Sequence, residues 1–382
     1  MLCGEEKSNM KGIRTILLFS SAFLCNLVIF GCNIPILKDL SFLSYLLLMT
    51  CLTVSIITSW LSRKITIREI AFSLLLITVA ILGVLKANES RFMIITLFSL
   101  ATIRFSFRDL IRYDYCSKVI IMIVILSLMI AGLISDDLSI RDGVVRHAMG
   151  FPHPNSVGFF AMTLMAEKLY LYKTDKTGAR MRLFAIAGLI VVLLLMSDSR
   201  TAQVAVVLCV IAFLLIKMPE INKRIKKSAR DDGKRASYIM PIVLFACIAI
   251  SIMSTVLFLN GDKTMVALNE ILSNRIYISS HYFKKYGISL LGQLVQRSDN
   301  SNYSLDNAYM RTLINYGVLS MTYLVFVFCS SSKKALEKEQ YFLYAMFAIY
   351  AIYGLMEAEI ISLAYNPFLL ATFSEVEGRI KR

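Results

Sequence analysis

The chain has 382 residues, of which 57% are hydrophobic and only 18% are charged, and its formal net charge is +15. A soluble domain of this length carries more charge and shorter apolar runs, so the composition excludes an ordinary soluble protein. The apolar runs approach the roughly 20 residues that cross about 30 Å of hydrocarbon as a helix. No alternating pattern indicates a membrane barrel, so the sequence predicts an all-α, multi-pass membrane protein.

The chain begins with polar residues, and no small-residue cleavage site follows the first apolar run, which predicts a retained helix rather than a signal peptide. The apolar pattern predicts about twelve membrane helices in one integral membrane domain, 1–382. These helices are expected near 13–34, 40–61, 69–86, 90–106, 117–135, 155–173, 183–198, 201–217, 238–259, 309–330, 341–358 and 360–376.

Positive charge concentrates in alternate loops, near 62–68, 104–112, 173–182, 218–237 and 333–338, and at both termini. The positive-inside rule places these loops and both termini in the cytoplasm. Topology and contact with anionic lipid thereby account for the excess of positive charge, and no nucleic-acid partner is expected. The basic loops carry no phosphate-binding glycine loop, which argues against an ATP-driven pump.

Two of the three histidines lie in one polar stretch that this topology turns outward, Arg146 to Asn155. His147 and His153 are side chains that exchange a proton near neutral pH, and Arg146 stands beside them at a membrane edge. Pro154 followed by Asn155 is typical of a helix start, with Asn155 as a candidate cap. The composition favours a site over a linker.

A second outward feature is the polar break Ser197–Thr201 between two apolar runs. Ser199 can cap the following helix by satisfying its first amide groups, and Arg200 would then project from the helix start. The break is the sole reason to divide this apolar stretch into two helices.

Four arginines fall at or near the outer membrane edge: Arg146, Arg200, Arg275 and Arg311. An arginine near hydrocarbon is costly unless it is paired, reaches the head groups or lines a wet cavity. Guanidinium groups match phosphate oxygens in a two-pronged geometry, so the set favours a site for a lipid-linked pyrophosphate. The alternatives are head-group contact and pairing with the carboxylates Asp198, Asp306 or Glu357.

The outward segment 260–308 is too long for an ordinary hairpin connection and is expected to be partly helical. Its end, Asp299–Tyr309, is rich in amides, carboxylates and tyrosines, which bind sugar hydroxyls and stack on sugar rings; a solvated turn has a similar composition. Asp306 lies where a helix re-enters the membrane. A carboxylate in such a partly dehydrated position can act as a general base, although it can also serve only as the N-terminal cap of a helix.

Together these motifs resemble the Wzy-type polysaccharide polymerases, within the O-antigen ligase and polymerase superfamily of bacterial envelopes. The resemblance spans roughly residues 145–370. The motifs that carry it are Gly150–Gly158, Ser197–Thr201, Asn274-Arg275 followed by Leu291-Gly292, Asp306-Asn307-x-Tyr309 leading to Gly317, and a late acidic element of Glu357 with Asn366-Pro367-Phe368.

The related O-antigen ligases are similar at the fourth motif, with one difference. They carry a histidine, then a small polar residue and a nine-residue gap to a glycine. Here Asn307 and Gly317 keep that gap, whereas Asp306 stands at the histidine position. This departure favours a polymerase over a ligase, and the resemblance places the acceptor base at Asp306.

The resemblance implies a metal-independent glycosyltransferase of the bacterial cytoplasmic membrane that makes O-antigen, capsule or exopolysaccharide. The donor and acceptor are oligosaccharides on undecaprenyl diphosphate, joined outside the cytoplasm without a nucleotide or other cofactor; a flippase and a chain-length regulator are the expected protein partners. Arg200 and Arg275 would stabilise the leaving diphosphate, and Asp306 would be the base. The residues expected to bind or orient substrate are Arg146, His147, His153, Asn155, Asn307, Tyr309 and Arg311.

Three alternatives remain open. A ligase that moves finished glycan to another acceptor shares the donor chemistry. A flippase for the same lipid-linked units would show two similar halves and charges deep in the membrane, and the sequence has no internal repeat. A non-enzymatic scaffold would not need the outward arginines. The eight cysteines show no paired spacing, so no metal is expected.

Overall fold

The computed structural model describes residues 2–32, 34–61, 66–141, 143–172, 178–231, 233–296 and 304–378. It is 77% helical, and eight of the described helices are long and apolar enough to cross a membrane. The prediction of an all-α, multi-pass membrane protein is confirmed at this level. The basic residues at 62–65, 173–177 and 379–382, and the sugar-binding candidates at 299–303, lie outside the described residues.

The chain forms two compact units, which the apolar pattern of the sequence does not reveal. Unit 1 comprises Met1–Ile65, Leu97–Asn222 and Leu363–Arg382, and unit 2 comprises Thr66–Thr96 and Lys223–Ser362. Two of the four boundaries fall within α5 (Arg91–Ala101) and α10 (Pro219–Asp231).

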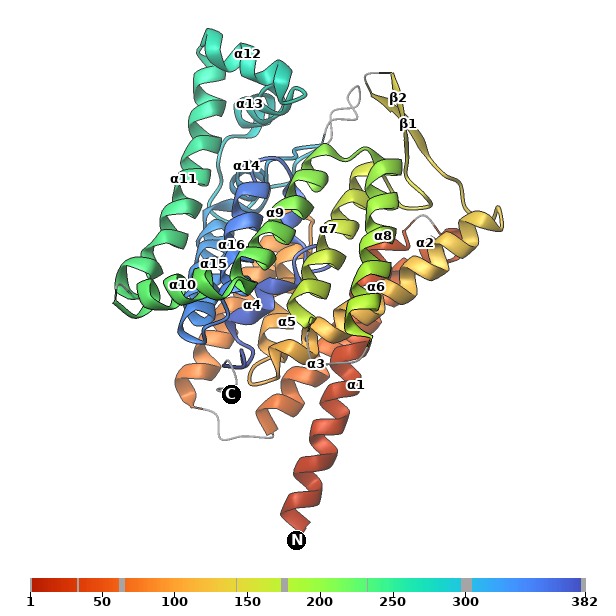
Figure 1. The fold of residues 1–382 in the computed structure, drawn as a ribbon, viewed down its shortest axis with the longest axis vertical. Coiled ribbons are helices and arrows are strands. Elements are labelled where there is room, and N and C mark those ends of the chain that lie inside the picture. The colour runs from red at the N-terminus through yellow and green to blue at the C-terminus, as the bar shows by residue number, and fades with distance from the viewer. Residues whose placement is uncertain are drawn as a thin grey trace. The chain divides into compact units, whose positions relative to one another are not determined.

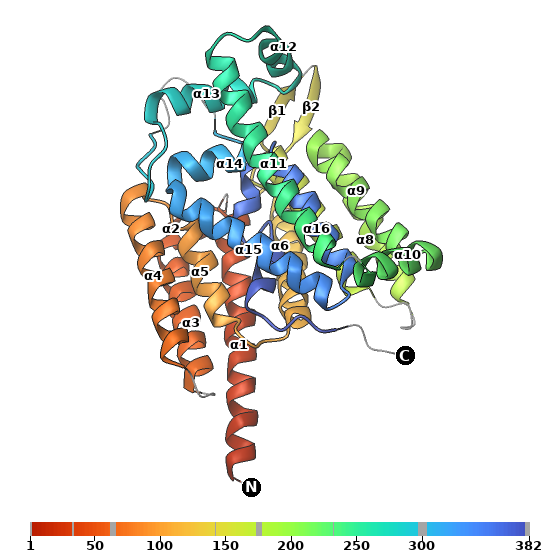
Figure 2. The same ribbon diagram turned by 90° about the vertical axis from the view of Figure 1, so that its left-hand side faces the viewer.

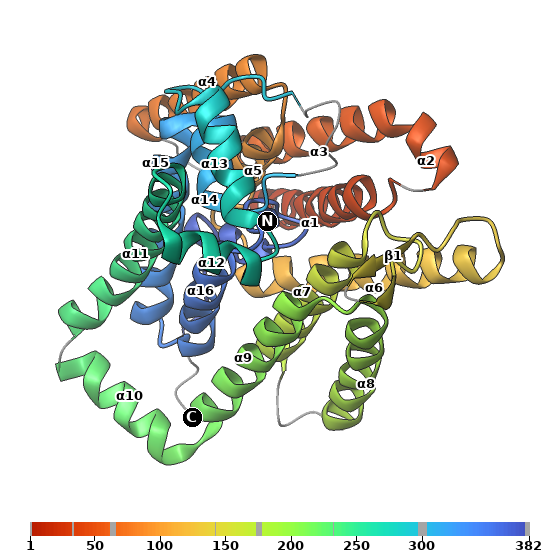
Figure 3. The same cartoon turned by 90° about the horizontal axis from the view of Figure 1, so that it is seen from above.

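Unit 1 is built around a helix that is buried along nearly its whole length, α7, which packs against α6, α8 and α9 (Figure 3). A helix that is apolar on all sides favours such a central position. Helix α1 lies along α3 and α6 (Figure 2). The elements of unit 1 are α1 (Leu2–Phe30), α2 (Pro35–Asp39), α3 (Ser41–Leu61), α6 (Phe107–Ile130), β1 (Leu138–Arg141), β2 (Val144–His147), α7 (Pro154–Leu171), α8 (Ala179–Ser197), α9 (Arg200–Lys217) and the 3-10 helix η3 (Pro367–Thr372).

Unit 2 is built around α11, which packs against α13, α15 and α16. Helices α12 and α13 follow α11 directly and lie beside its end (Figure 1), so the long segment 260–308 is partly helical, as predicted. The elements of unit 2 are α4 (Ile67–Ala87), α11 (Gly233–Leu259), α12 (Lys263–Ile271), α13 (Arg275–Tyr286), α14 (Ala308–Arg311), the π-helix η1 (Thr312–Tyr316), α15 (Gly317–Glu337), α16 (Tyr341–Tyr353) and the 3-10 helix η2 (Ala358–Ile361).

Several predicted elements differ from the observed ones; the span expected at 117–135, for example, begins earlier, as α6 at Phe107. The span expected at 360–376 is not an α-helix: the short 3-10 helices η2 and η3 occupy this region, and Pro367 disfavours α geometry at Asn366 before it. The basic loop expected at 218–237 is mostly helix, α10 and the start of α11. The span expected at 309–330 begins as α14 and η1 before α15. The break at Ser197–Thr201 is confirmed, because α8 ends at Ser197 and α9 begins at Arg200.

Candidate functional site

Two residues predicted to be catalytic come together in unit 2. The Arg275 Nη2 atom lies 4.0 Å from Asp306 Oδ2 and 3.0 Å from Glu357 Oε1. Arg275 begins α13, directly after Asn274, whose left-handed φ of 65° is a conformation that asparagine adopts more readily than most residues. The third motif, the fourth motif and the late acidic element therefore meet at one guanidinium group, which we call the Arg275 cluster.

The guanidinium of Arg275 is charged and incompletely satisfied. Burial by itself lowers the pKa of Arg275, but Glu357 and then Asp306 raise it above its ordinary value. Its side chain is 15% exposed, and its Nη1 atom is buried without a hydrogen-bond partner. A buried donor without a partner costs stability, and a substrate oxygen would satisfy it.

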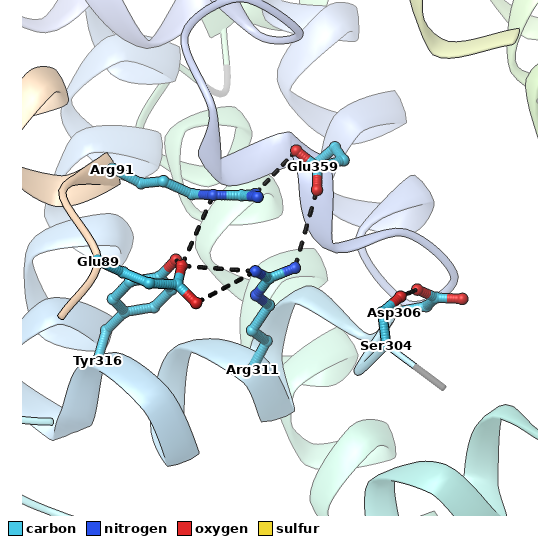
Figure 4. A network of polar contacts seen from close by, with 7 residues as sticks. All are labelled: Glu89, Arg91, Ser304, Asp306, Arg311, Tyr316 and Glu359. Atoms are coloured by element: carbon cyan, nitrogen blue, oxygen red, sulfur yellow. Dashed lines mark hydrogen bonds and ion pairs between the residues drawn. The ribbon is translucent and has the colours of Figure 1, made fainter. Parts of the chain in front are cut away.

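Asp306 is the accessible carboxylate of the Arg275 cluster. Its side chain is 30% exposed, whereas that of Glu357 is 5% exposed. One Asp306 oxygen accepts a hydrogen bond of 2.5 Å from the Ser304 hydroxyl (Figure 4), and the other faces Arg275. A partly exposed carboxylate that lies beside a guanidinium can take a proton from a bound hydroxyl, which suits a general base.

The side chains of Asn307 and Tyr309 make hydrogen bonds within the protein. Asn307 caps α14: its side-chain oxygen accepts from the amides of Tyr309 and Met310, and its amide donates to Ser251 Oγ and Leu355 O. Tyr309 is fully buried, and its hydroxyl donates to Ala351 O at 2.6 Å. Both were predicted to bind substrate; in the structure they fix the backbone next to Asp306, and the cap is Asn307 rather than Asp306.

The two motif glycines of unit 2 lie against each other. Gly292 and Gly317 both have positive φ, 95° and 86°. A Cβ on Gly317 would lie 2.4 Å from Gly292 N, and one on Gly292 would lie 2.6 Å from Asn315 O. Only glycine allows this crossing of two backbones, which joins the segment after α13 to the start of α15.

Arg311 belongs to a second polar group of unit 2, a closed ring of charges (Figure 4). Arg311 lies 3.4 Å from Glu89 and 3.8 Å from Glu359, while Arg91 lies 2.8 Å from Glu359 and 3.7 Å from Glu89. The hydroxyl of Tyr316 donates to Glu89. Two guanidinium groups and two carboxylates balance in this group, which we call the Glu89–Arg311 ring.

The Glu89–Arg311 ring lowers the pKa of Glu89. Burial raises the pKa of Glu89, but Arg311, Tyr316 and Arg91 outweigh it and hold the pKa below its ordinary value. The sequence interpretation did not single out Glu89, Arg91 or Glu359 as site residues. The available signal was that Glu89 and Arg91 lie together at the short turn between two apolar runs.

An apolar cavity of about 420 Å³ lies in unit 2 between α4, α5 and α15. Phe72, Phe92 and Phe326 are among the residues that line it. Phe92 also packs on the ring of Tyr316, with centroids 4.8 Å apart, so the cavity adjoins the Glu89–Arg311 ring. A cavity of this size and lining suits a hydrocarbon chain.

In unit 1 the first two motifs converge on Arg146. Arg146 is 5% exposed; its Nε donates to Ser197 O at 3.0 Å, and its Nη2 donates to Asn155 Oδ1 at 2.5 Å. Gly158 allows the close approach, because a Cβ there would lie 2.4 Å from the Ser199 side chain. The Arg146–Asn155 pair therefore ties β2 and the start of α7 to the end of α8.

The two histidines of unit 1 have different surroundings. His147 Nδ1 lies 2.6 Å from Asp136 Oδ2, and Asp136 also accepts from the Met149 amide. His153 is exposed and caps α7, because its Nδ1 accepts from the Asn155 amide at 3.1 Å. The cap predicted for Asn155 is thus supplied by His153, which leaves the Asn155 oxygen for Arg146.

Arg200 is exposed at the first position of α9. The expected cap is wrong: Ser199 occupies the cap position, but its side chain makes no capping bond and its hydroxyl is buried without a partner. Asp198 is held by Arg141, which donates to its carbonyl at 2.6 Å and its carboxylate at 2.8 Å. The sequence interpretation did not single out Arg141, which ends strand β1.

The predicted residues thus fall into two groups, one in each unit. Arg146, His147, His153, Asn155 and Arg200 lie in unit 1, and Arg275, Asp306, Asn307, Tyr309 and Arg311 lie in unit 2. Among the residues that the structure describes, no three His, Cys, Asp or Glu side chains are grouped to hold a metal ion. Comparison with models of protein families, with curated proteins and with solved structures finds no match.

Proposed function

We propose that this protein is a membrane glycosyltransferase that polymerises oligosaccharide repeat units carried on undecaprenyl diphosphate. The observation that carries the proposal is the Arg275 cluster, where a partly exposed carboxylate, Asp306, lies beside a buried guanidinium with an unsatisfied donor. This arrangement offers a proton acceptor and an anion ligand side by side, which glycosyl transfer from a diphosphate requires.

In the proposed step, the acceptor sugar hydroxyl attacks the anomeric carbon of the donor glycan. The bond between that carbon and the diphosphate oxygen breaks, a new glycosidic bond forms, and Asp306 takes the hydroxyl proton. The Nη1 group of Arg275 donates to an oxygen of the departing diphosphate, whose negative charge grows as the bond breaks. The diphosphate leaves with the bonding electron pair, so neither a nucleotide nor an oxidant is needed.

The apolar cavity between α4, α5 and α15 supports a lipid-linked substrate, because it adjoins charged groups and could hold part of an isoprenoid chain. We assign the protein to the bacterial cytoplasmic membrane as a multi-pass protein with both termini inside, on the positive-inside pattern. Arg146, His147, His153, Asn155 and Arg200 of unit 1 stay predictions for sugar or phosphate binding.

A transporter of the same lipid-linked units is the second candidate, because unit 1 contains charges within its helices that the sequence interpretation overlooked. Lys118 is fully buried and pairs with Asp114 and, at 2.5 Å, with Glu167. Asn26 donates to Asp114 at 2.6 Å. Charged groups inside membrane helices frequently mark a transport path.

Reconstitution separates these functions. Purified protein in liposomes would receive undecaprenyl-diphosphate-linked repeat units isolated from cells that lack this chain. Ladders of lipid-linked glycan, absent from protein-free liposomes, are the expected result. Transfer of a single unit to a foreign acceptor would instead identify a ligase. Movement of the repeat unit across the bilayer without new glycosidic bonds would identify a transporter.

A further inference from the structure

Unit 1 contains a basic cavity to which the proposed polymerase activity gives no role. Its volume is about 190 Å³, and it lies where the ends of α6, α7 and α8 meet. The residues that matter for its chemistry are Arg108, Arg112, Tyr115, Lys168, Tyr172 and Arg182. We call it the α6–α8 basic pocket.

Contacts within unit 1 hold the walls of this pocket in place. Arg108 Nη2 donates to Leu171 O at 2.7 Å, which joins the start of α6 to the last residue of α7. The ammonium group of Lys168 lies 5.2 Å from the ring centre of Tyr115, at the distance of a cation–π contact. One turn further along α6, Lys118 pairs with Glu167 and again ties α6 to α7. The pocket is therefore built on rigid helices.

The charge of the α6–α8 basic pocket indicates an anionic ligand. Three helices contribute four cationic side chains, and among the described residues that line the pocket none is acidic. Arg112 reaches Asp109 outside the lining at 3.2 Å, but the two side chains are 55% and 37% exposed and such a pair is weak. A fifth cation, Lys217, lies 5.7 Å from the ring centre of the lining residue Tyr172. Like charges around one cavity repel each other, and a bound anion relieves that repulsion.

The size of the pocket limits the ligand to a small group. Its volume of about 190 Å³ equals that of about six water molecules in the liquid. Drug-sized ligands fill sites of roughly 300 Å³ or more. Guanidinium and ammonium groups around a space this small suit a phosphate group, which arginine binds with two parallel hydrogen bonds.

The position of the pocket favours a phosphate carried by a membrane lipid. Helix α7 has 18 residues, so its two ends are about 27 Å apart, close to the thickness of the hydrocarbon layer. The Arg146–Asn155 pair lies at the start of α7 and the basic pocket at its end. Beside Arg182, Met181 and Phe184 are 77% and 74% exposed, which offers apolar surface for lipid tails.

We propose that the α6–α8 basic pocket binds the phosphate group of an anionic membrane lipid, in the leaflet opposite the Arg146–Asn155 pair. The chemistry recognised is a phosphate mono- or diester with an adjoining hydrocarbon chain. Basic pockets between membrane helices on the cytoplasmic side bind lipid head groups of this class. The site is independent of glycosyl transfer.

The test measures ligand-dependent thermal stabilisation of the full-length protein in a neutral detergent. The probes are dioctanoyl phosphatidic acid, dioctanoyl phosphatidylglycerol, dioctanoyl phosphatidylcholine and inorganic pyrophosphate. The two anionic lipids should stabilise the wild-type protein at lower concentration than the zwitterionic lipid. The variant Arg112→Gln/Lys168→Gln/Arg182→Gln leaves Arg108 in place to hold α7. It should need at least roughly ten-fold more anionic lipid than the wild type to reach the same thermal stabilisation.

A matched control removes the same charge elsewhere. Lys263→Gln/Lys284→Gln/Lys285→Gln changes three exposed cations of α12 and α13 in unit 2, on the segment predicted to face outward, and should bind anionic lipid as the wild type does. Equal lipid affinity of the pocket variant and the wild type would overturn the site. Stabilisation by pyrophosphate at the same concentration as by lipid would overturn the membrane source and leave a soluble phosphate ligand. If the triple variant does not fold, Arg112→Gln/Arg182→Gln, in which both changed residues are exposed, replaces it with the same criteria.

Discussion

Arg275 and Arg311 belong to the same unit and were predicted for the same diphosphate, yet their surroundings differ. Arg311 shares two carboxylates with Arg91, and the charges of the Glu89–Arg311 ring cancel. Arg275 lies beside Asp306 and Glu357, and its buried Nη1 donor has no hydrogen-bond partner among the described residues. The comparison teaches that an arginine at a membrane edge marks only a candidate, and that the surrounding charges and donors decide how far its guanidinium group is already satisfied within the protein.

The strongest test of this contrast is Asp306→Asn. The substitution keeps the shape of the side chain but removes its proton affinity, so chain growth should fall by about 10² to 10⁴-fold. The rate of ladder formation in liposomes measures the effect, and Ser304→Ala, which removes only a hydrogen bond to Asp306, should cost far less. Wild-type chain growth in Asp306→Asn would remove Asp306 as the base.

The same chemical change at the two arginines should give opposite results. Arg275→Lys keeps the positive charge but loses the forked geometry and the spare donor, so turnover should fall by about 10²-fold with little change in melting temperature. Arg311→Lys, the matched control, should keep most of the activity. Comparable losses of turnover in both variants would end the distinction between the two arginines.

Removal of the charge at Arg311 should lower stability. The side chain is 13% exposed, and Arg311→Met leaves Glu89 and Glu359 facing each other with one cation fewer. The two carboxylates are 30% and 26% exposed, so the loss should lie between that of a surface pair and that of a buried pair, at about 1 to 3 kcal/mol. Thermal unfolding in detergent measures the loss, and Glu89→Gln/Arg311→Met should recover part of it. A double variant less stable than Arg311→Met would contradict the ring as a balanced unit.

The smallest expected effect is a pH dependence from Glu89. Its folded pKa lies below the ordinary value of 4.5, so the unfolded chain takes up a proton first as the pH falls. The stabilising contribution is therefore complete above pH 4.5 and is lost as the pH falls below it through the folded pKa. Melting temperatures should fall more steeply below this pH for the wild type than for Glu89→Gln. Parallel curves would show that Glu89 does not contribute.

Many residues of the site could be identified in the sequence as motif positions, although their geometry could not. The glycines at 292 and 317 were identified as motif positions, and they prove to be the point where two backbones cross. Asn274-Arg275 and Asp306 were chosen from segments 31 residues apart along the chain, and the fold brings them within 4.0 Å. The roles within the motifs were less predictable: Asn307 rather than Asp306 caps α14, and His153 rather than Asn155 caps α7.

The sequence by itself determined the membrane class and the helical content, because hydropathy and length alone decide whether a segment is stable in hydrocarbon. Tertiary structure decided which polar groups pair. Glu89 and Arg311, or Lys118 and Glu167, are far apart in the chain, and no local pattern encodes their contact. It also decided that 360–376 forms short 3-10 helices, since a buried apolar segment with a proline fits more than one local geometry. The hydrophobicity of a segment follows from its own residues, whereas the pairing of a charged group depends on residues from distant segments that folding brings next to it.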